Sequence, residues 1–116
     1  MVVGMIRIPF PPDRRVNVMG ILRSIQGPVL AMSGCKACDV YEDLGQEPAA
    51  LLIEQWETKE AFETHIRSEA CRRILDAIEV AGRRPEVRFD MVSKSEGMEL
   101  IERLRKREGT GAMASG

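Results

Sequence analysis

Four stretches of the chain have the hydrophobic patterns of β-strands. Residues 2–8 and 49–57 are apolar at nearly every position, which is typical of strands that are covered on both faces. Residues 29–41 are small, apolar or β-branched and lack helical spacing, which also favours a strand. Residues 85–93 alternate between apolar and charged side chains, and this period of two predicts a half-buried strand.

A first helix is predicted between the first two strands. Val18, Leu22 and Ile25 recur at i, i+4 and i+7, the spacing of one helix face. Gly27 and Pro28 follow directly, and we expect this pair to end the helix because proline cannot continue the hydrogen-bonding pattern.

A second helix is predicted after the third strand. Thr58 and Ser68 are both suited to cap a helix N-terminus, so the helix is expected to break at Ser68. Gly82 and the nearby Pro85 end it. Its buried face is expected to comprise Phe62, Ile66, Cys71, Ile74, Leu75 and Ile78.

The C-terminal part predicts one more amphipathic helix, with Met98, Ile101 and Leu104 on its apolar face. Residues 109–116 are mostly small and are expected to form a disordered tail. Residues 1–108 are expected to form a single domain, since the chain has the length of one ordinary domain.

The predicted order is β-α-β-β-α-β followed by one helix, which indicates the ferredoxin-like class of α+β folds. In this arrangement the helices cover one face of an antiparallel sheet and leave the other face open. The strands at residues 2–8 and 49–57 are too apolar for an open face to stay in water. We therefore expect a homodimer that packs sheet against sheet, with the C-terminal helix able to reach the partner.

Charge and cysteine content limit the classes of partner and the compartment. The 17 basic and 18 acidic residues give a net charge of -1, so no basic field is present to attract nucleic acid or an anionic membrane. No apolar run has the length of a membrane span, and residues 1–8 are too short and lack the basic start of a secretory signal, so neither is expected. The three cysteines are an odd number, which favours reduced thiols and a cytoplasmic location.

Three stretches together resemble a known family. They are the strand "GCKACDVYED" at residues 34–43, "LLIEQWETKEAFETHIRSEAC" at residues 51–71, and "RPEVRFDMVSKSEGMELIERLR" at residues 84–105. The second stretch resembles an E-x-W strand end followed by a helix with a His and then a Ser. The chain is similar in these features to the antibiotic biosynthesis monooxygenase family, which includes small quinol monooxygenases.

The resemblance implies a dimeric α/β barrel and a small aromatic or quinol ligand. Members of the family with known activity oxygenate phenols, quinols or polycyclic aromatics with molecular oxygen, and use no metal, flavin or haem. We therefore expect a cofactor-independent monooxygenase that oxidises a quinol or a related aromatic. A non-catalytic dimer of the same fold that binds a ligand or acts as a scaffold stays open as the alternative.

His65 is the candidate catalytic residue because it is the single histidine and lies beside the apolar face of the second helix. Oxygenation without a cofactor needs a substrate that can lose a proton, so one positioned base is the minimum requirement. His65 could instead fix the broken helix through a hydrogen bond. Trp56 and Phe62 could line an aromatic-binding cavity, or Trp56 could simply be part of the core.

Charged residues inside apolar strands are candidates for a polar lining of the pocket. Glu54, Arg88 and Asp90 are assigned to the substrate pocket on this basis, with Arg7 in a similar position. Alternating opposite charges also suit ion pairs across strands or across a dimer, and the sequence does not decide between the two roles.

Cys35 and Cys38 form a C-x-x-C spacing that invites a metal or redox interpretation. Residues three apart in an extended strand point to opposite faces, so the two thiols are not expected to converge. Adding Cys71 and His65 gives no usual zinc-ligand spacing. Packing of small side chains is the preferred interpretation, and no metal site is predicted.

Overall fold

Four antiparallel strands form one sheet. The computed structural model describes the backbone of residues 1–111 and the side chains of residues 1–106. The strands are β1 (Val2–Pro9), β2 (Cys35–Asp43), β3 (Ala49–Trp56) and β4 (Glu86–Met91). Their order across the sheet is β2-β3-β1-β4. The sheet order and the α+β composition confirm the predicted ferredoxin-like fold.

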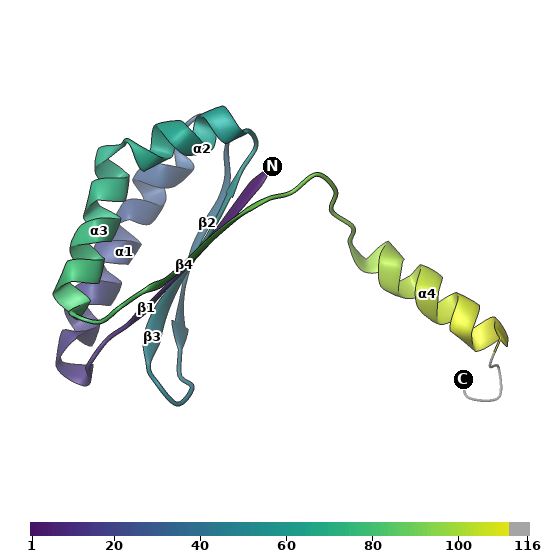
Figure 1. Cartoon of the computed structure of the whole chain (residues 1–116), viewed down its shortest axis with the longest axis horizontal. Coiled ribbons are helices and arrows are strands. Elements are labelled where there is room, and N and C mark those ends of the chain that lie inside the picture. The colour runs from purple at the N-terminus through teal and green to yellow at the C-terminus, as the bar shows by residue number, and fades with distance from the viewer. Residues whose placement is uncertain (112–116) are drawn as a thin grey trace.

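Three α-helices cover one face of this sheet (Figure 1). A 3₁₀ turn, η1 (Pro12–Arg14), leads into α1 (Arg15–Leu30), and α2 (Lys59–Ile66) is followed closely by α3 (Glu69–Ala81). A fourth helix, α4 (Met98–Gly111), stands apart at the end of an extended segment. Within residues 1–111, no helix combines the length and apolarity that crossing a membrane would require.

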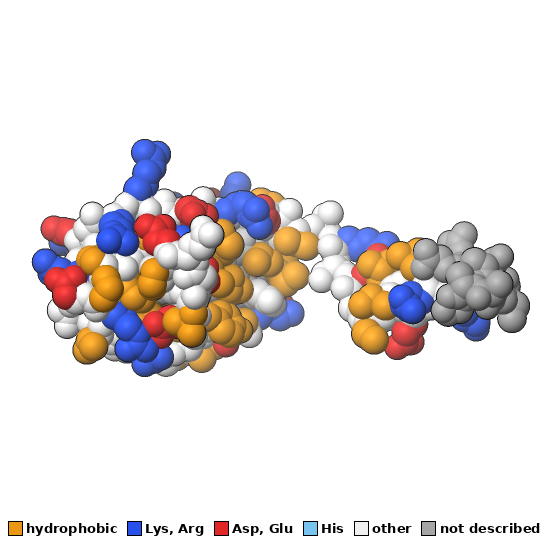
Figure 2. All heavy atoms as spheres, turned by 90° about the horizontal axis from the view of Figure 1, so that it is seen from below, with side chains coloured by type: hydrophobic (Ala, Val, Ile, Leu, Met, Phe, Trp, Pro, Cys, Tyr) orange, Lys and Arg blue, Asp and Glu red, His pale blue; other side chains and the backbone are white. Residues whose placement is uncertain are grey.

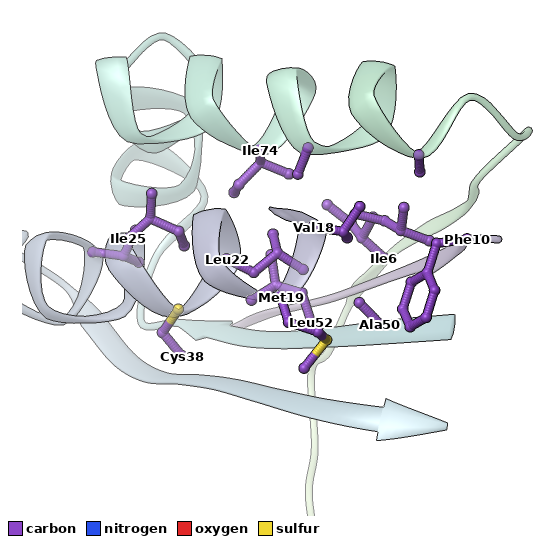
Figure 3. Close-up of a cluster of buried hydrophobic side chains, with 14 of the residues drawn as sticks. Ile6, Phe10, Val18, Met19, Leu22, Ile25, Cys38, Ala50, Leu52 and Ile74 are labelled. Atoms are coloured by element: carbon purple, nitrogen blue, oxygen red, sulfur yellow. The ribbon is translucent and has the colours of Figure 1, made fainter. Parts of the chain in front are cut away.

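The hydrophobic core lies between the sheet and α1 and α3 (Figure 3). In β1, Val2, Ile6 and Ile8 point to the helices and are buried, whereas the side chains between them face the open side and are half-buried. Helix α1 contributes Val18, Met19, Leu22, Ile25 and Val29. The apolar face of the strands, with its period of two, therefore packs against the apolar face of the helices, with its period of 3.6, as the sequence predicts.

The break in the second predicted helix is confirmed, and its cause is a pair of caps. Thr58 Oγ1 accepts a hydrogen bond from the Ala61 amide, and Ser68 Oγ accepts one from the Cys71 amide. Each cap satisfies an amide that would otherwise have no partner in the first turn. Gly82 then ends α3 in the left-handed conformation, with a φ of 69°.

The predicted end of the first helix at Gly27 and Pro28 is wrong, because α1 continues to Leu30 with Pro28 inside it. Proline in the last turn removes one hydrogen bond, but continuing the helix buries Val29 completely. The second strand consequently begins at Cys35, after a turn that contains Gly34 at a φ of 84°.

The expectation that the last strand is half-buried is wrong for the single chain. Every residue of β4 is exposed, including Val87, Phe89 and Met91 on the helix side of the sheet. The reason is that β4 is an edge strand of the sheet, and the core lies over the other three strands. Helix α4 reaches Gly111, so the first residues of the expected tail are helical, and residues 112–116 lie outside the described residues.

The two cysteines of β2 lie on the same face of the sheet, contrary to the prediction. A β-bulge between Cys35 and Ala37 inserts one extra residue and reverses the alternation. Cys35 therefore pairs with Trp56 and Cys38 with Glu54, and both partners face the helices. All three cysteines of the chain are free thiols, and Figure 3 shows Cys38 within the core. Burial, assisted by the negative charge of Glu54, raises the pKa of the Cys38 thiol to about 12.

This shift predicts that Cys38 lowers the stability of the chain at alkaline pH. The folded state retains the thiol proton to about pH 12, whereas an unfolded thiol loses it near pH 9. Stability is therefore unaffected below about pH 8.5 and falls above it, by at most about 1.4 kcal/mol per pH unit. Urea unfolding at pH 7 and pH 10 should show that the chain loses about 1 kcal/mol more than a Cys38→Ala variant. Equal losses in the two proteins would contradict the assignment.

Candidate functional site

A cavity of about 230 Å³ lies on the helix side of the sheet, between β1, β4 and the pair α2 and α3. Its walls are mainly apolar and are formed by Ile6, Ile66, Ile74, Leu75, Ile78, Val87 and Phe89. Three lining residues carry other chemistry, namely Glu54, His65 and Cys71. An apolar cavity with a few convergent polar groups is the usual form of a small-molecule site.

Glu54 and His65 form a buried pair at the polar end of this cavity. The His65 Nε2 atom lies 3.0 Å from Glu54 Oε1 and 3.2 Å from Glu54 Oε2. The two residues are only 3% and 1% exposed, so water cannot take the place of either partner. A buried carboxylate is tolerated only when it accepts hydrogen bonds, and His65 supplies one of them.

Trp56 supplies the second hydrogen bond to the same carboxylate. Its Nε1 donates to Glu54 Oε1 at 2.9 Å, and its ring stacks on the His65 ring with centroids 4.7 Å apart. Trp56 itself is completely buried and does not line the cavity. The cavity-lining role predicted for Trp56 is thus not what the structure shows. The tryptophan instead holds the pair in place through its hydrogen bond to Glu54 and its stacking on His65.

Local structure explains why these residues meet. Glu54 and Trp56 are two residues apart in β3 and share its helix-facing side. His65 lies in the last turn of α2, just before the break, where Ser68 Oγ donates to the His65 carbonyl at 2.6 Å. The same hydroxyl caps α3, so one serine sets the end of α2 and the start of α3.

The hydrogen-bond pattern indicates which nitrogen of His65 carries a proton. An ionised carboxylate can only accept, so the contact with Glu54 places a hydrogen on Nε2. In a neutral imidazole, Nδ1 is then the acceptor. This Nδ1 is buried and has no hydrogen-bond partner among the described residues. As a buried ring nitrogen without a partner, it is the atom of His65 that can accept a proton.

The remaining predicted site residues lie elsewhere. Phe62 is buried outside the cavity and packs against Phe89, with ring centroids 4.9 Å apart. Arg88 and Asp90 alternate with the cavity-lining residues of β4 and so point to the open face of the sheet. There Arg88 Nε and Asp90 Oδ2 form an exposed ion pair at 3.2 Å. Of the predicted pocket residues, only Glu54 and His65 line the cavity.

Arg7 is also part of an ion-pair network and not of the cavity. It contacts Asp43, Glu47 and Glu86 and so ties three segments together at one end of the open face. Its side chain is 18% exposed, which favours a structural contribution from this cluster.

Sequence reasoning did not assign Phe89 or Cys71 to the site. Phe89 is recognisable only once β4 is known to lie beside β1 and next to the cavity. Burial, and secondarily the charge of Glu54, raises the pKa of the Cys71 thiol, which favours its protonated form. Within the part of the chain that is described, no three or more metal-ligating side chains cluster together.

The ferredoxin-like fold with an apolar cavity beneath its helices defines a class of small α+β proteins, and comparisons identify the family. A sequence model described as antibiotic biosynthesis monooxygenase matches residues 1–77, which is more than half of the chain. The chain belongs to this family, as the sequence resemblance implied. The match includes Glu54, Trp56 and His65, and it ends before β4 and α4. No curated protein sequence matches the chain.

Solved structures share the fold at low sequence identity. A "putative antibiotic biosynthesis monooxygenase" from Deinococcus radiodurans is 19% identical, with a TM-score of 0.76 over 84% of this chain and 98% of that one. Rv0793 from Mycobacterium tuberculosis is 22% identical, with a TM-score of 0.68 over 83% of this chain and 98% of that one. PA3566 from Pseudomonas aeruginosa is 22% identical, with a TM-score of 0.69 over 80% of this chain and 94% of that one.

A Glu54→Gln substitution tests the hydrogen-bonded arrangement directly. Glutamine replaces one carboxylate oxygen with an NH2 group that can only donate, and it removes the negative charge that Trp56 and His65 share. We expect the indole N–H resonance of Trp56, the only tryptophan, to move upfield in a proton–nitrogen correlation spectrum. The free energy of unfolding should fall by about 1–3 kcal/mol.

The matched control for this prediction is Glu57→Gln. Glu57 is an exposed glutamate three residues further along the chain. Its substitution should change neither the indole resonance nor the free energy of unfolding measurably. An unchanged indole resonance in Glu54→Gln would show that the carboxylate does not hold Trp56 in solution.

Proposed function

We propose that the chain is a monooxygenase that oxidises a quinol or a related small hydroxylated aromatic with molecular oxygen. The observation that carries the proposal is the buried Glu54 and His65 pair at the polar end of an otherwise apolar cavity. Membership in the antibiotic biosynthesis monooxygenase family supports this class of reaction. The apolar walls suit the ring of such a substrate, and the polar end suits its hydroxyl group.

The reaction balances without an added reductant. A quinol and O2 give a hydroxyquinone and water, and each product receives one of the two atoms of O2. The substrate loses four electrons, two as its hydroxyls become carbonyls and two as a C–H bond becomes a C–OH bond. Oxygen takes up these four electrons. The role left to the protein is to hold the substrate and remove its first proton, because the quinol anion donates electrons to oxygen far more readily than the neutral quinol.

His65 is proposed as the base for this step. The unpaired Nδ1 accepts the hydroxyl proton, and the imidazolium that forms keeps its Nε2 hydrogen bond to Glu54. Glu54 stabilises the positive charge because both groups are withdrawn from water. Trp56 fixes the carboxylate, so the pair needs little reorganisation when the proton moves.

The proposal is tested by oxygen consumption with a panel of quinols. A His65→Gln variant keeps most of the side-chain volume but cannot act as a base. We expect the uptake above the autoxidation background to fall at least hundredfold, the usual contribution of a general base. Circular dichroism should confirm that the variant is folded.

Thr64→Ala is the matched control, because Thr64 is the exposed neighbour of His65 on α2 and does not line the cavity. It should retain full activity. Background uptake by the unmodified chain across the panel would contradict the oxygenase proposal and favour the alternative, a non-catalytic member of the fold that binds a ligand.

We also propose that two copies of the chain pair through the open face of the sheet to form the dimeric barrel. Val3, Met5, Leu51 and Ile53 lie on this face and are only half-buried in the single chain. Around them are charges of both signs, including the Arg88 and Asp90 ion pair, so the face can complement itself about a two-fold axis.

An Ile53→Asp substitution tests the pairing. A carboxylate in the middle of an apolar interface loses its water without gaining a partner, so we expect the dimer to dissociate. Sedimentation equilibrium should give the dimer mass for the parent chain and about half of that mass for the variant. Val16→Asp is the control, because Val16 is 74% exposed on α1, away from the sheet. A monomeric parent chain, or a dimeric Ile53→Asp, would contradict this interface.

A further inference from the structure

Phe89 forms one wall of the cavity at the edge of the sheet. It lies on β4, is 37% exposed, and carries the only hydrocarbon ring among the described residues that line the cavity. Glu54 and His65 supply the polar end, and Phe89 is one of the apolar walls that enclose the rest. A ligand bound between the polar end and the edge of the sheet therefore meets this ring.

The position of the ring depends on a glycine in the neighbouring strand. Phe89 pairs with Gly4 of β1. A Cβ placed on Gly4 would lie 3.0 Å from Cδ1 and 3.1 Å from Cε1 of Phe89, closer than ordinary contact. The missing side chain thus allows the ring to rest on the backbone of β1. From the other side, the ring of Phe62 supports it at a centroid distance of 4.9 Å and an angle of 56°.

The size of the cavity indicates what this wall excludes. Its volume is about 230 Å³. An apolar cavity of roughly 150 Å³ holds benzene, and sites for drug-sized ligands begin at roughly 300 Å³. One ring with its substituents, or two compact fused rings, would fit. A third fused ring exceeds this volume, and Phe89 is the aromatic wall on the edge strand that such a ligand would have to displace or pass.

We propose that Phe89, seated on Gly4, is the specificity-determining residue of the site and limits its ligand to an aromatic of one or two fused rings. This inference rests on the proposed function for the hydroxylated aromatic nature of the ligand. It does not require turnover, since it concerns which ligands enter the cavity.

Binding of three phenols of increasing size tests the proposal. Phenol, 1-naphthol and 9-phenanthrol are titrated by calorimetry under nitrogen into the full chain, Phe89→Ala and Met91→Ala. We expect the parent chain to bind 9-phenanthrol at least tenfold more weakly than 1-naphthol. In Phe89→Ala we expect 9-phenanthrol to gain more than its deficit in the parent chain, so that the preference reverses, while phenol binds about 2–10-fold more weakly because it loses an aromatic contact.

Met91→Ala is the matched control. Met91 occupies the same face of β4 and is 60% exposed, but it does not line the cavity. It should keep the size preference of the parent chain. A uniform change for all three phenols in Phe89→Ala would indicate a merely structural role and would overturn the proposal.

Gly4→Ala tests the same wall by narrowing the cavity, whereas Phe89→Ala widens it. Its Cβ should push the Phe89 ring off β1 toward the helices, which narrows the cavity. We expect 1-naphthol to bind roughly tenfold more weakly and phenol to change little. Adding Phe89→Ala to this variant should restore 1-naphthol binding, because the added Cβ then has no ring to displace.

The two proposals fail separately. A size preference that reverses in Phe89→Ala, in a protein without oxygen uptake, would retain this inference and reject the oxygenase. Oxygen uptake with an unchanged size preference in Phe89→Ala would reject this inference alone. Binding of none of the three phenols to the parent chain would also overturn it.

Discussion

The carboxylate of Glu54 is the constraint around which the helix side of the sheet is arranged. It is 3% exposed and accepts hydrogen bonds from Trp56 and His65, which lie on different elements. Burying a charged group costs far more than any single contact returns unless its oxygens are satisfied, so both donors must be in place. That requirement links the end of β3 to the end of α2, and the Ser68 cap holds the second of these. A buried pair that serves packing alone could be replaced by apolar side chains, whereas a pair that borders a cavity has a reason to stay polar.

The two faces of the sheet separate two tasks. On the helix side, alternation places Glu54, Phe89 and Val87 around the cavity. On the open side it places Met5, Arg88 and Asp90, which do not contact the cavity. An interface on the open face therefore need not alter the chemistry on the other. Edge strand β4 contributes to both faces, with Val87 and Phe89 on the helix side and Arg88 and Asp90 on the open side. Figure 2 shows hydrophobic side chains on the body and on α4, which stands away from it.

The fold could be predicted from the sequence because its local signals agree with the tertiary structure. The periodicity in β1 and α1, the caps at Thr58 and Ser68, and Gly82 at the end of α3 all led to the correct element order. The errors arose where tertiary packing outweighed a local rule. Burial of Val29 carried α1 past Pro28, and a one-residue bulge placed Cys35 and Cys38 on the same face. No property of the letters in "GCKACDVYED" indicates a bulge, since it is a relation between two strands.

The site was harder to predict than the fold for a related reason. His65 and Glu54 could be selected by type, as a lone histidine and a charge inside an apolar strand. Arg88 and Asp90 satisfied the same criterion and lie on the opposite face, because a sequence gives the alternation of a strand but not which half faces the helices. Phe89 was not assigned to the site although it lines the cavity. An aromatic in an alternating strand reads as core, and only its pairing with Gly4 shows that it rests on bare backbone at an exposed edge. A side chain that the interior does not need in that position, and for which the neighbouring strand leaves room, is well placed to act on what enters the cavity.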